Sequence, residues 1–373
     1  MKNSVDTARR DWYNKEKKQR ETDAVNEPNA LAWEAPSLAD AFRARFRIGA
    51  AVNTWDLDPA SEACAAIRKQ FDILTLENES KPINVQPEEG RFVFDKLDRF
   101  TAFGEAHGID LRGHTLVWHS QVPMWFFEGE NGAPATRDQL LARMRTHIST
   151  VVSRYRGRIA TWDVLNEVLR DEGGLRESRW YKIAGRDYIP EAFIAAHEAD
   201  PDARLLINDY NLESSEAKAD TMVSLVEELL REGVPVGGVG LQMHLSLFTD
   251  LDLLKKNVRK IADLCRIDPA LRLEATELDV SCYRFGDTAE NLDWTPALEA
   301  DFRAKYTEIF RVLCALADEG SLDTVVFWGL SDAVSWLNGF PRRHKNYPLL
   351  IGRGWRVKPA FYDVLALAGN KEV

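Results

Sequence analysis

The strongest constraint on how this chain can fold is a repeated alternation between apolar, strand-like runs and helical patterns along its 373 residues. Repeated strand–helix units favour a parallel sheet, and eight of them favour a closed, single-domain (β/α)8 TIM barrel. An open doubly wound sheet is the alternative, but no GxGxxG turn follows the first strand. The eight predicted strands are Phe46–Val52, Ile73–Asn78, Leu111–Trp118, Thr161–Glu167, Leu205–Tyr210, Val239–His244, Leu271–Val280 and Thr324–Leu330.

Local signals place several of the helices. Thr136 and Gln139 form a capping box, which predicts a helix start. Asp95 opens another helix that Gly108 ends, and an apolar face over residues 222–230 ends at Gly233. Further helices are expected around residues 59–70, 190–199, 250–266, 297–318 and 359–368.

The two ends of the predicted domain differ in character. Residues 1–35 are polar and lack periodicity, so we interpret them as an arm, partly disordered or lying across the body, and residues 36–373 as the barrel. The amino terminus is basic but has no apolar run, so it is not a secretory signal, and no segment approaches the ~18 apolar residues of a membrane helix. We expect a cytoplasmic protein, or a secreted one if a leader has been removed.

Charge and cysteine content exclude some partners. The net charge of −11 disfavours nucleic acid and anionic membranes, which need Lys and Arg, and it is compatible with a neutral polymer. The four cysteines form no CxxC pair, so a zinc or redox site has no support, and a disulfide between any pair is left open. The oligomeric state is not indicated.

Polar and aromatic residues gather where the predicted strands end, which is where barrel enzymes place their catalytic groups. A single carboxylate at a strand end is usually a salt-bridge partner or a helix cap. Polar and aromatic residues at seven strand ends in register are not explained in this way. Burying such groups costs energy unless they satisfy each other. The residues are Glu77, Asn78, Lys81, His114, Trp118, His119, Gln121, Asp163, Asn166, Glu167, Asn208–Asn211, Gln242, His244, Glu277, Asp279, Trp328, Asp332 and Trp336.

The two-residue period of a strand assigns these side chains to faces. Glu277 and Asp279 should share a face, with Thr276 opposite. Asp163 and Glu167 should share a face if their strand stays regular to its end. The polar side chains of each strand are therefore expected to point to the same end of the barrel.

Two carboxylates among amides, imidazoles and aromatic rings suit glycoside hydrolysis. One acid protonates the leaving oxygen while the other carboxylate attacks or activates water. Other chemistries have less support, because there is no GxSxG elbow, no P-loop, and no second His after His197-Glu198 to complete HExxH. A metal site from His114, His244 and a carboxylate is a remaining alternative.

The motifs at the strand ends resemble, in order, those of the family 10 glycoside hydrolases, the endo-β-1,4-xylanases. The resemblance covers about residues 38–367. The matching segments are Gly49–Asn53, Glu77–Asn78, Arg112–His119, Trp162–Glu167, Asn208–Asn211, Gln242–His244, Thr276–Asp279, Phe327–Gly329 and Ser335–Trp336.

This resemblance implies a retaining mechanism on xylan or xylo-oligosaccharides, with no metal and no organic cofactor. It implies that Glu167 is the acid/base and Glu277 the nucleophile, supported by Asn166, His244 and Asp279. The substrate-binding residues that it implies are Glu77, Asn78, Lys81, His114, Trp118, Gln121, Tyr210, Asn211, Gln242, Trp328 and Trp336.

Two readings compete with a xylanase. One is another β-1,4-glycanase barrel, a cellulase or mannanase, and the space left by Trp328 and Trp336 distinguishes it. The other is a non-catalytic carbohydrate-binding barrel, against which the intact Glu167 and Glu277 argue. The segment Trp336–His344 also resembles the loop of shorter, intracellular bacterial members of the family.

Overall fold

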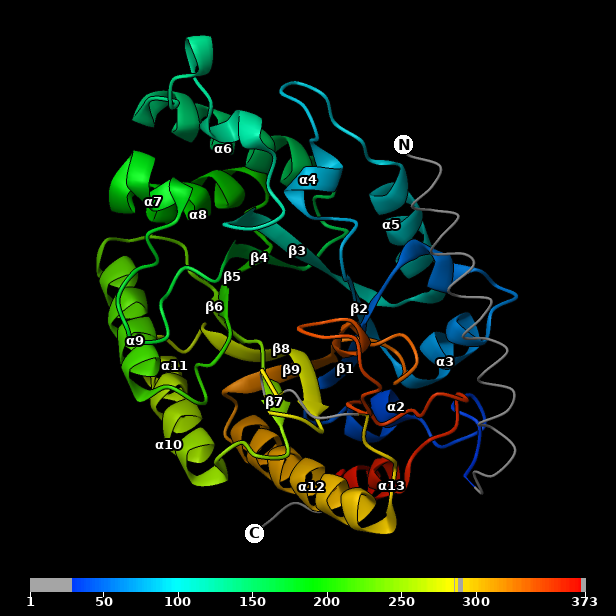
Figure 1. Cartoon of the computed structure of the whole chain (residues 1–373). Coiled ribbons are helices and arrows are strands. Elements are labelled where there is room, and N and C mark those ends of the chain that lie inside the picture. Colours follow the sequence, from blue (N-terminus) through cyan, green and yellow to red (C-terminus); the bar gives the residue numbers. More distant parts are fainter. Residues whose placement is uncertain (1–28, 285, 288–290, 370–373) are drawn as a thin grey trace.

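The strands form the inner wall of the molecule. The computed structural model describes residues 29–284, 286–287 and 291–369, and Figure 1 shows its helices arranged around a central sheet. The strands are β1 (Arg47–Val52), β2 (Ile73–Leu76), β3 (Asp110–Trp118), β4 (Thr161–Asn166), β5 (Arg204–Asp209), β6 (Gly238–Leu241), β7 (His244–Ser246), β8 (Arg272–Ser281) and β9 (Leu322–Phe327).

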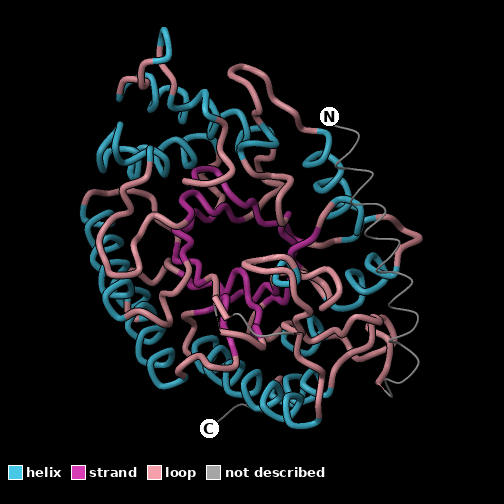
Figure 2. Tube along the Cα trace, in the orientation of Figure 1, coloured by secondary structure: helices cyan, strands magenta, loops and turns pink. Residues whose placement is uncertain are grey.

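The sheet closes on itself. Its strand order is β6-β5-β4-β3-β2-β1-β9-β8-β7, and an additional pairing joins β6 to β8. All these pairings are parallel. The ring therefore contains eight strands, with the short β7 attached to β8 at one end (Figure 2). The predicted (β/α)8 barrel is confirmed, and the open doubly wound sheet is excluded because that sheet would keep two free edges.

Helices surround the ring, and their starts and stops follow the local signals. Thr136 and Gln139 make the predicted capping box, and Gly108 ends its helix in the left-handed conformation. The helices are α2 (Leu38–Phe42), α3 (Glu62–Gln70), α4 (Pro82–Val85), α5 (Asp95–His107), α6 (Arg137–Arg154), α7 (Arg179–Ala184), α8 (Tyr188–Ala199), α9 (Glu216–Arg231), α10 (Leu251–Ala262), α11 (Leu264–Ile267), α12 (Pro296–Asp318) and α13 (Pro359–Leu367). Short 3-10 helices are η2 (Thr54–Leu57), η3 (Met124–Phe127), η4 (Glu130–Gly132), η5 (Gly185–Asp187) and η6 (Trp336–Asn338).

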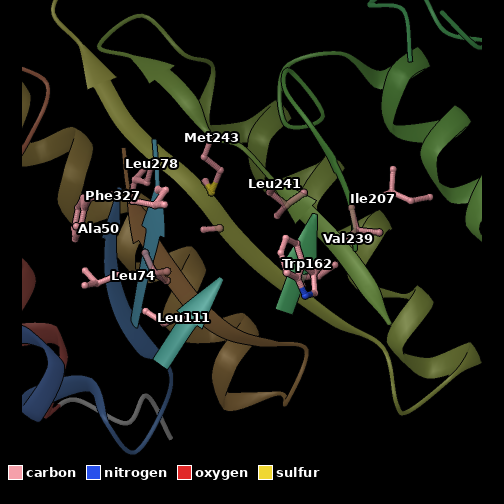
Figure 3. Close-up of a cluster of buried hydrophobic side chains, with 14 of the residues drawn as sticks. Ala50, Leu74, Leu111, Trp162, Ile207, Val239, Leu241, Met243, Leu278 and Phe327 are labelled. Atoms are coloured by element: carbon pink, nitrogen blue, oxygen red, sulfur yellow. The ribbon is translucent and has the colours of Figure 1, made fainter. Parts of the chain in front are cut away.

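The apolar core lies between the ring of strands and the helices. Figure 3 shows buried side chains that come from neighbouring strands, among them Leu74, Leu111, Trp162 and Phe327. Each of these alternates along its strand with residues of the opposite face. Burial of this continuous apolar layer is what holds the helices on the barrel.

The inside of the barrel, by contrast, carries buried charges. The Arg112 side chain is fully buried, and its Nη2 lies 2.8 Å from Asp163 Oδ1 while its Nε lies 2.6 Å from Glu274 Oε2. On the other side of Glu274, Oε1 lies 3.2 Å from Arg204 Nη1. Buried charges are tolerated only when they are paired in this way. These ion pairs connect the interior of the barrel to Asp163 in β4.

The predicted amino-terminal arm is described only in part. Residues 1–28 lie outside the described residues. Leu31 forms an antiparallel bridge with Arg356, and the Ala32 N–H donates to the Trp355 carbonyl at 2.8 Å. Residues 29–35 thus contact the carboxyl-terminal part of the barrel, while the division at residue 35 stays a prediction.

All four cysteines are free thiols, so none of the disulfides that the sequence left open is formed. Among the described residues, no helix is both long and apolar enough to cross a bilayer.

Candidate active site

The two glutamates of the signature strands lie at one mouth of the barrel. Glu277 belongs to β8 and Glu167 directly follows β4, so both stand at carboxyl ends of parallel strands. The side chain of Glu277 is only 5% exposed, whereas that of Glu167 is 16% exposed. Glu167 is therefore the more accessible of the two to a proton from solvent.

A chain of amide side chains joins these two carboxylates. The Asn208 Nδ2 donates to Glu277 Oε1 at 2.7 Å and to Asn166 Oδ1 at 2.9 Å. The Gln242 Nε2 donates to Asn166 Oδ1 at 3.1 Å and lies 3.5 Å from Glu167 Oε1. The three amides fix the two carboxylates relative to each other, as a reaction with two carboxyl groups on one bond requires.

On its other side, Glu277 contacts a partly buried imidazole. His244 Nε2 donates to Glu277 Oε2 at 3.1 Å and His244 Nδ1 donates to Asp279 Oδ2 at 3.1 Å. The Trp336 Nε1 also donates to Asp279 Oδ2, at 2.8 Å. Burial alone would lower the pKa of His244, but the charges and hydrogen bonds of Asp279 and Glu277 raise it to about 10. His244 is therefore a cation at neutral pH.

Glu277 is held as a carboxylate by these neighbours. Burial would raise the pKa of Glu277, but the charge of His114 and the hydrogen bond and charge of His244 outweigh burial and lower it. His114 Nδ1 lies 3.9 Å from Glu277 Oε1 and is itself held by Asp163 Oδ2 at 2.9 Å. An ionised carboxylate is the form that can attack a carbon centre.

This arrangement predicts the effect of His244→Asn on pH dependence. Asparagine can still donate a hydrogen bond but removes the positive charge, so the pKa of Glu277 should rise. If Glu277 is the nucleophile that the sequence predicts, it reacts as the carboxylate, and the acidic limb of kcat/KM should then move to higher pH, by about one to two units if a charged hydrogen bond of ~1.5–3 kcal/mol is weakened. The measurement is the pH profile of kcat/KM on an activated aryl glycoside.

A matched control is His107→Asn, which removes an exposed imidazole from the last turn of α5. Its acidic limb should coincide with that of the unmodified protein. An unshifted limb in His244→Asn would show that His244 does not set the ionisation of Glu277.

Glu167 has a different environment. Its Oε2 lies 3.7 Å from His119 Nε2, and among the described residues no lysine or arginine forms an ion pair with its carboxyl. Burial, the main cause, lowers the pKa of His119 despite the opposing charge of Glu167. The main chain is fixed instead, because Arg176 Nε donates to the Glu167 carbonyl at 2.8 Å. Glu167 thus lacks the cationic hydrogen-bond partner that Glu277 has in His244.

The residues expected to bind sugar on the β2 and β3 side form one group. Asn53 Nδ2 donates to Glu77 Oε2 at 2.9 Å, and Lys81 Nζ donates to Asn78 Oδ1 at 3.0 Å. The Lys81 ammonium also lies 4.9 Å from the centre of a Trp118 ring. Burial lowers the pKa of Lys81, although the carboxylates of Glu277, Glu77 and Glu167 oppose this shift. This electrostatic influence links the group to the two glutamates.

Aromatic rings surround the buried end of the site. The Trp328 ring lies 5.1 Å from that of His114 and 6.2 Å from that of His244, centre to centre. Trp336 lies 5.0 Å from His244, and Trp118 lies 6.4 Å from His114. Flat apolar sugar faces stack on such rings, which also limit the space beside Glu277.

Tyr210 marks the β5 side of the site. Its hydroxyl accepts a hydrogen bond from Arg176 Nη2 at 2.8 Å, and the Lys218 ammonium lies 3.5 Å from its ring centre. Arg176 therefore connects Tyr210 to the backbone of Glu167.

Two of the predicted binding residues lie on irregular backbone. Asn211 has φ +55° and its Nδ2 lies 3.4 Å from Asp171 Oδ2, while Gln121 has φ +46° and accepts the Ile83 N–H on its carbonyl at 3.0 Å. Neither contact joins these residues to the hydrogen-bond network of the glutamates. They form part of the loops after β5 and β3.

One expectation about strand faces needs correction. Thr276 was expected opposite Glu277, but Thr276 Oγ1 donates to Asn208 Oδ1 at 2.6 Å while Glu277 accepts from the same amide. The reason is a register shift in β8 between Ala275 and Leu278, which adds a residue and brings both side chains to one face.

The strand of Glu167 is also irregular. The register of β4 shifts after Asp163, and Glu167 itself has φ +57°. The sixth predicted strand likewise breaks at Met243, which has φ +57°, so that its last residue, His244, begins β7 and pairs with Asp279. At these irregular positions the backbone directs the polar side chains toward the same end of the barrel.

The sequence did not assign a role to Asn208 or Arg112. Asn208 bridges Asn166 and Glu277, and Arg112 holds Asp163, which holds His114. A signal for Arg112 existed, since an arginine near the start of a predicted barrel strand, Leu111–Trp118, is unexpected unless it is paired. The partners themselves could not be read from the chain.

The metal alternative gains no support from the geometry. Among the described residues, no group of three or more His, Cys, Asp and Glu side chains is placed to hold a metal ion.

The closed barrel and its pair of carboxylates with different surroundings define a glycoside hydrolase. Residues 37–367 match the model of glycosyl hydrolase family 10. The chain belongs to this family.

Similar proteins agree with this assignment. The chain is 42% identical over 337 residues to an endo-1,4-beta-xylanase of Geobacillus stearothermophilus, covering 88% of this chain and 98% of that protein. It is 40% identical over 357 residues to endo-1,4-beta-xylanase C of Paenibacillus barcinonensis, covering 91% of this chain but only 32% of that protein. The solved structure of an intracellular xylanase from Thermoanaerobacterium saccharolyticum superposes with a TM-score of 0.80 at 40% identity, covering 89% of this chain and 98% of that one.

Proposed function

We propose that this chain is a retaining endo-β-1,4-xylanase with Glu277 as nucleophile and Glu167 as acid/base. The observation that carries the proposal is the contrast between the two carboxyl groups. Glu277 is buried, hydrogen-bonded to a cationic His244 and has a lowered pKa, while Glu167 is more exposed and has no such cation. A retaining glycosidase needs this pair of roles.

The reaction follows from these positions. Glu277 attacks the anomeric carbon as the bond to the leaving oxygen breaks, and Glu167 transfers its proton to that oxygen. Glu167, now ionised, then removes a proton from water, which attacks the same carbon and releases Glu277. Asn166 and Asn208 hold the geometry, and no step needs a metal or an organic cofactor.

We assign the remaining residues by their position around this pair. Asp279 orients His244, with which it shares a hydrogen bond. The residues on the β2 and β3 side bind the sugar that becomes the glycosyl part, and those after β5 contact the leaving-group part. The first group is Glu77, Asn78, Lys81, His114, Trp118 and Gln121, the second is Tyr210 and Asn211, and Gln242, which follows β6, contacts the reacting sugar itself.

Xylan is the proposed substrate, rather than cellulose, because of the rings beside Glu277. Trp328 and Trp336 occupy space next to His244, and a xylose unit lacks the hydroxymethyl group that a glucose unit would place against such rings. The names of the xylanase relatives support the same choice. A different name among the similar proteins, an exoglucanase of Acetivibrio thermocellus at 39% identity, makes the comparison with glucan worth testing.

The test is a pair of substrates that differ only in that group. We expect kcat/KM to be higher for aryl β-xylobioside than for aryl β-cellobioside, by about tenfold or more if the rings exclude one hydroxymethyl group. A preference for the cellobioside would overturn the assignment to xylan while leaving the roles of the glutamates open to their own tests.

We also propose that the enzyme acts inside the cell on short oligosaccharides. The support is the segment Trp336–His344 and the likeness to the intracellular xylanase of Thermoanaerobacterium saccharolyticum. Fractionation of the native host tests this proposal, since activity found mainly in the culture medium would contradict it.

A further inference from the structure

A cavity lies at the same mouth of the barrel, outside the residues assigned above. Its volume is about 280 Å³, near the small end of the ~300–1,000 Å³ typical of ligand pockets. Ser246, the last residue of β7, lines it together with Phe248 and Arg284, which follow β7 and β8. Ser214 lines it from the loop after β5, the loop that carries Tyr210. The cavity thus opens on the leaving-group side of the site, and we call it the Arg284 pocket.

The guanidinium of Arg284 is held by an aromatic ring and not by an acid. It lies 4.1 Å from the centre of the Phe248 ring, which is itself 49% exposed. Among the described residues, no carboxylate forms an ion pair with Arg284. A stacked guanidinium is fixed in place while its N–H donors stay available, which suits recognition of a carboxylate.

Other groups of the Arg284 pocket also offer hydrogen atoms to a ligand. The hydroxyl oxygens of Ser246 and Thr249 each accept a backbone N–H, from Phe248 at 3.2 Å and from Ser246 at 3.0 Å. Their O–H groups are therefore left to donate. The one acid of the lining, Asp250, accepts the N–H groups of Asp252 and Leu253 at the start of α10, and these hydrogen bonds stabilise its charge.

We propose that the Arg284 pocket binds a carboxylate-bearing sugar, a uronic acid branch, on the leaving-group side of the substrate chain. This rests on the proposed function. In such a complex the carboxylate pairs with Arg284 and the sugar hydroxyls accept from Ser246 and Thr249. Since the whole chain carries a net charge of −11, it does not attract an acidic polymer over long range, and selectivity for acid must come from a local cation.

The test compares two xylo-oligosaccharides of equal backbone length, one linear and one with a single glucuronic acid branch. In Arg284→Gln we expect KM for the branched substrate to rise by about five- to tenfold, as for a partly exposed charged hydrogen bond, with kcat changed less than about twofold. The linear substrate should be unaffected. Arg284→Lys should retain much of the selectivity, and Arg266→Gln on the exposed surface of α11 is the matched control.

Binding is measured separately by calorimetry in the Glu277→Ala background, where turnover does not interfere. If adding Arg284→Gln selectively lowers the affinity for the branched oligosaccharide, the result supports the proposed role of the Arg284 pocket. This holds even if the unmodified chain cleaves neither oligosaccharide, because the absence of cleavage would contradict only the proposed function. Equal losses for both oligosaccharides, or no loss for either, would overturn the acid-binding role of Arg284.

Discussion

Replacing Glu277 with alanine should abolish turnover of polymeric xylan and of activated aryl xylosides alike, by roughly 10⁴- to 10⁶-fold in kcat. The loss should not depend on the leaving group, because the bond to the anomeric carbon cannot form at all. The neighbours of Glu277 cannot replace it: Asn208 is a neutral amide, and His244 is a cation at neutral pH. Steady-state kinetics on both kinds of substrate, with thermal denaturation to confirm that the barrel is intact, is the measurement.

A buried glutamate outside the hydrogen-bond network of the two carboxylates provides the matched control. Glu213 is fully buried, and burial raises its pKa to about 7, but it makes no hydrogen bond to Glu277 or Glu167. Glu213→Gln should keep kcat within several-fold of the unmodified value at neutral pH. If Glu277→Ala kept substantial activity on an activated aryl xyloside, Glu277 could not be the nucleophile.

The barrel could be predicted because its signals are local. A capping box at Thr136, a left-handed glycine at Gly108 and apolar runs of strand length are each readable within a few residues, and their alternation fixes the number of βα units. Eight such units predict a closed ring of strands. The structure has this ring, since β6 pairs with β8 as well as with β5.

The arrangement within the site could be predicted only in part. The polar residues at the predicted strand ends included the two glutamates, but the predicted face of Thr276 was wrong because β8 is irregular there. A strand period of two holds only for a regular ladder, and the register shifts in β4 and β8 and the positive φ of Glu167 are set by pairing with neighbouring strands.

The link through Asn208 was missed for a related reason. Asn208 pairs in register with Asn166 of β4, and its amide reaches Glu277 of β8 past the intervening strand β6. Close approach is possible because Gly240 of β6 has no side chain, and a Cβ there would lie 2.3 Å from Asn208 Oδ1. Such a contact depends on three strands at once, which no local pattern in the sequence contains.

Glu167→Ala should give a loss that depends on the leaving group. Polymeric xylan, whose leaving oxygen needs a proton, should lose activity by about 10²- to 10⁴-fold more than an aryl glycoside with an acidic phenol, which is the usual contribution of general acid catalysis. Hydrolysis of the glycosyl-enzyme also loses its base, so this intermediate should accumulate and KM for the aryl glycoside should fall. Kinetics on a series of phenols of increasing pKa measures both effects.

Added azide separates the two glutamates by the configuration of its product. In Glu167→Ala, azide needs no base to attack the glycosyl-enzyme on Glu277, so turnover of the aryl glycoside should recover and yield the β-glycosyl azide. In Glu277→Ala no glycosyl-enzyme forms, and azide can react only by direct displacement to the α-azide. The difference follows from the geometry, because Glu277 and the leaving group lie on opposite sides of the anomeric carbon. In Glu167→Ala azide attacks from the side that the leaving group has left, and in Glu277→Ala it attacks from the side where Glu277 would be. Proton NMR of the products reads the configuration directly, and a β-azide from Glu277→Ala with an α-azide from Glu167→Ala would mean that the two roles are reversed.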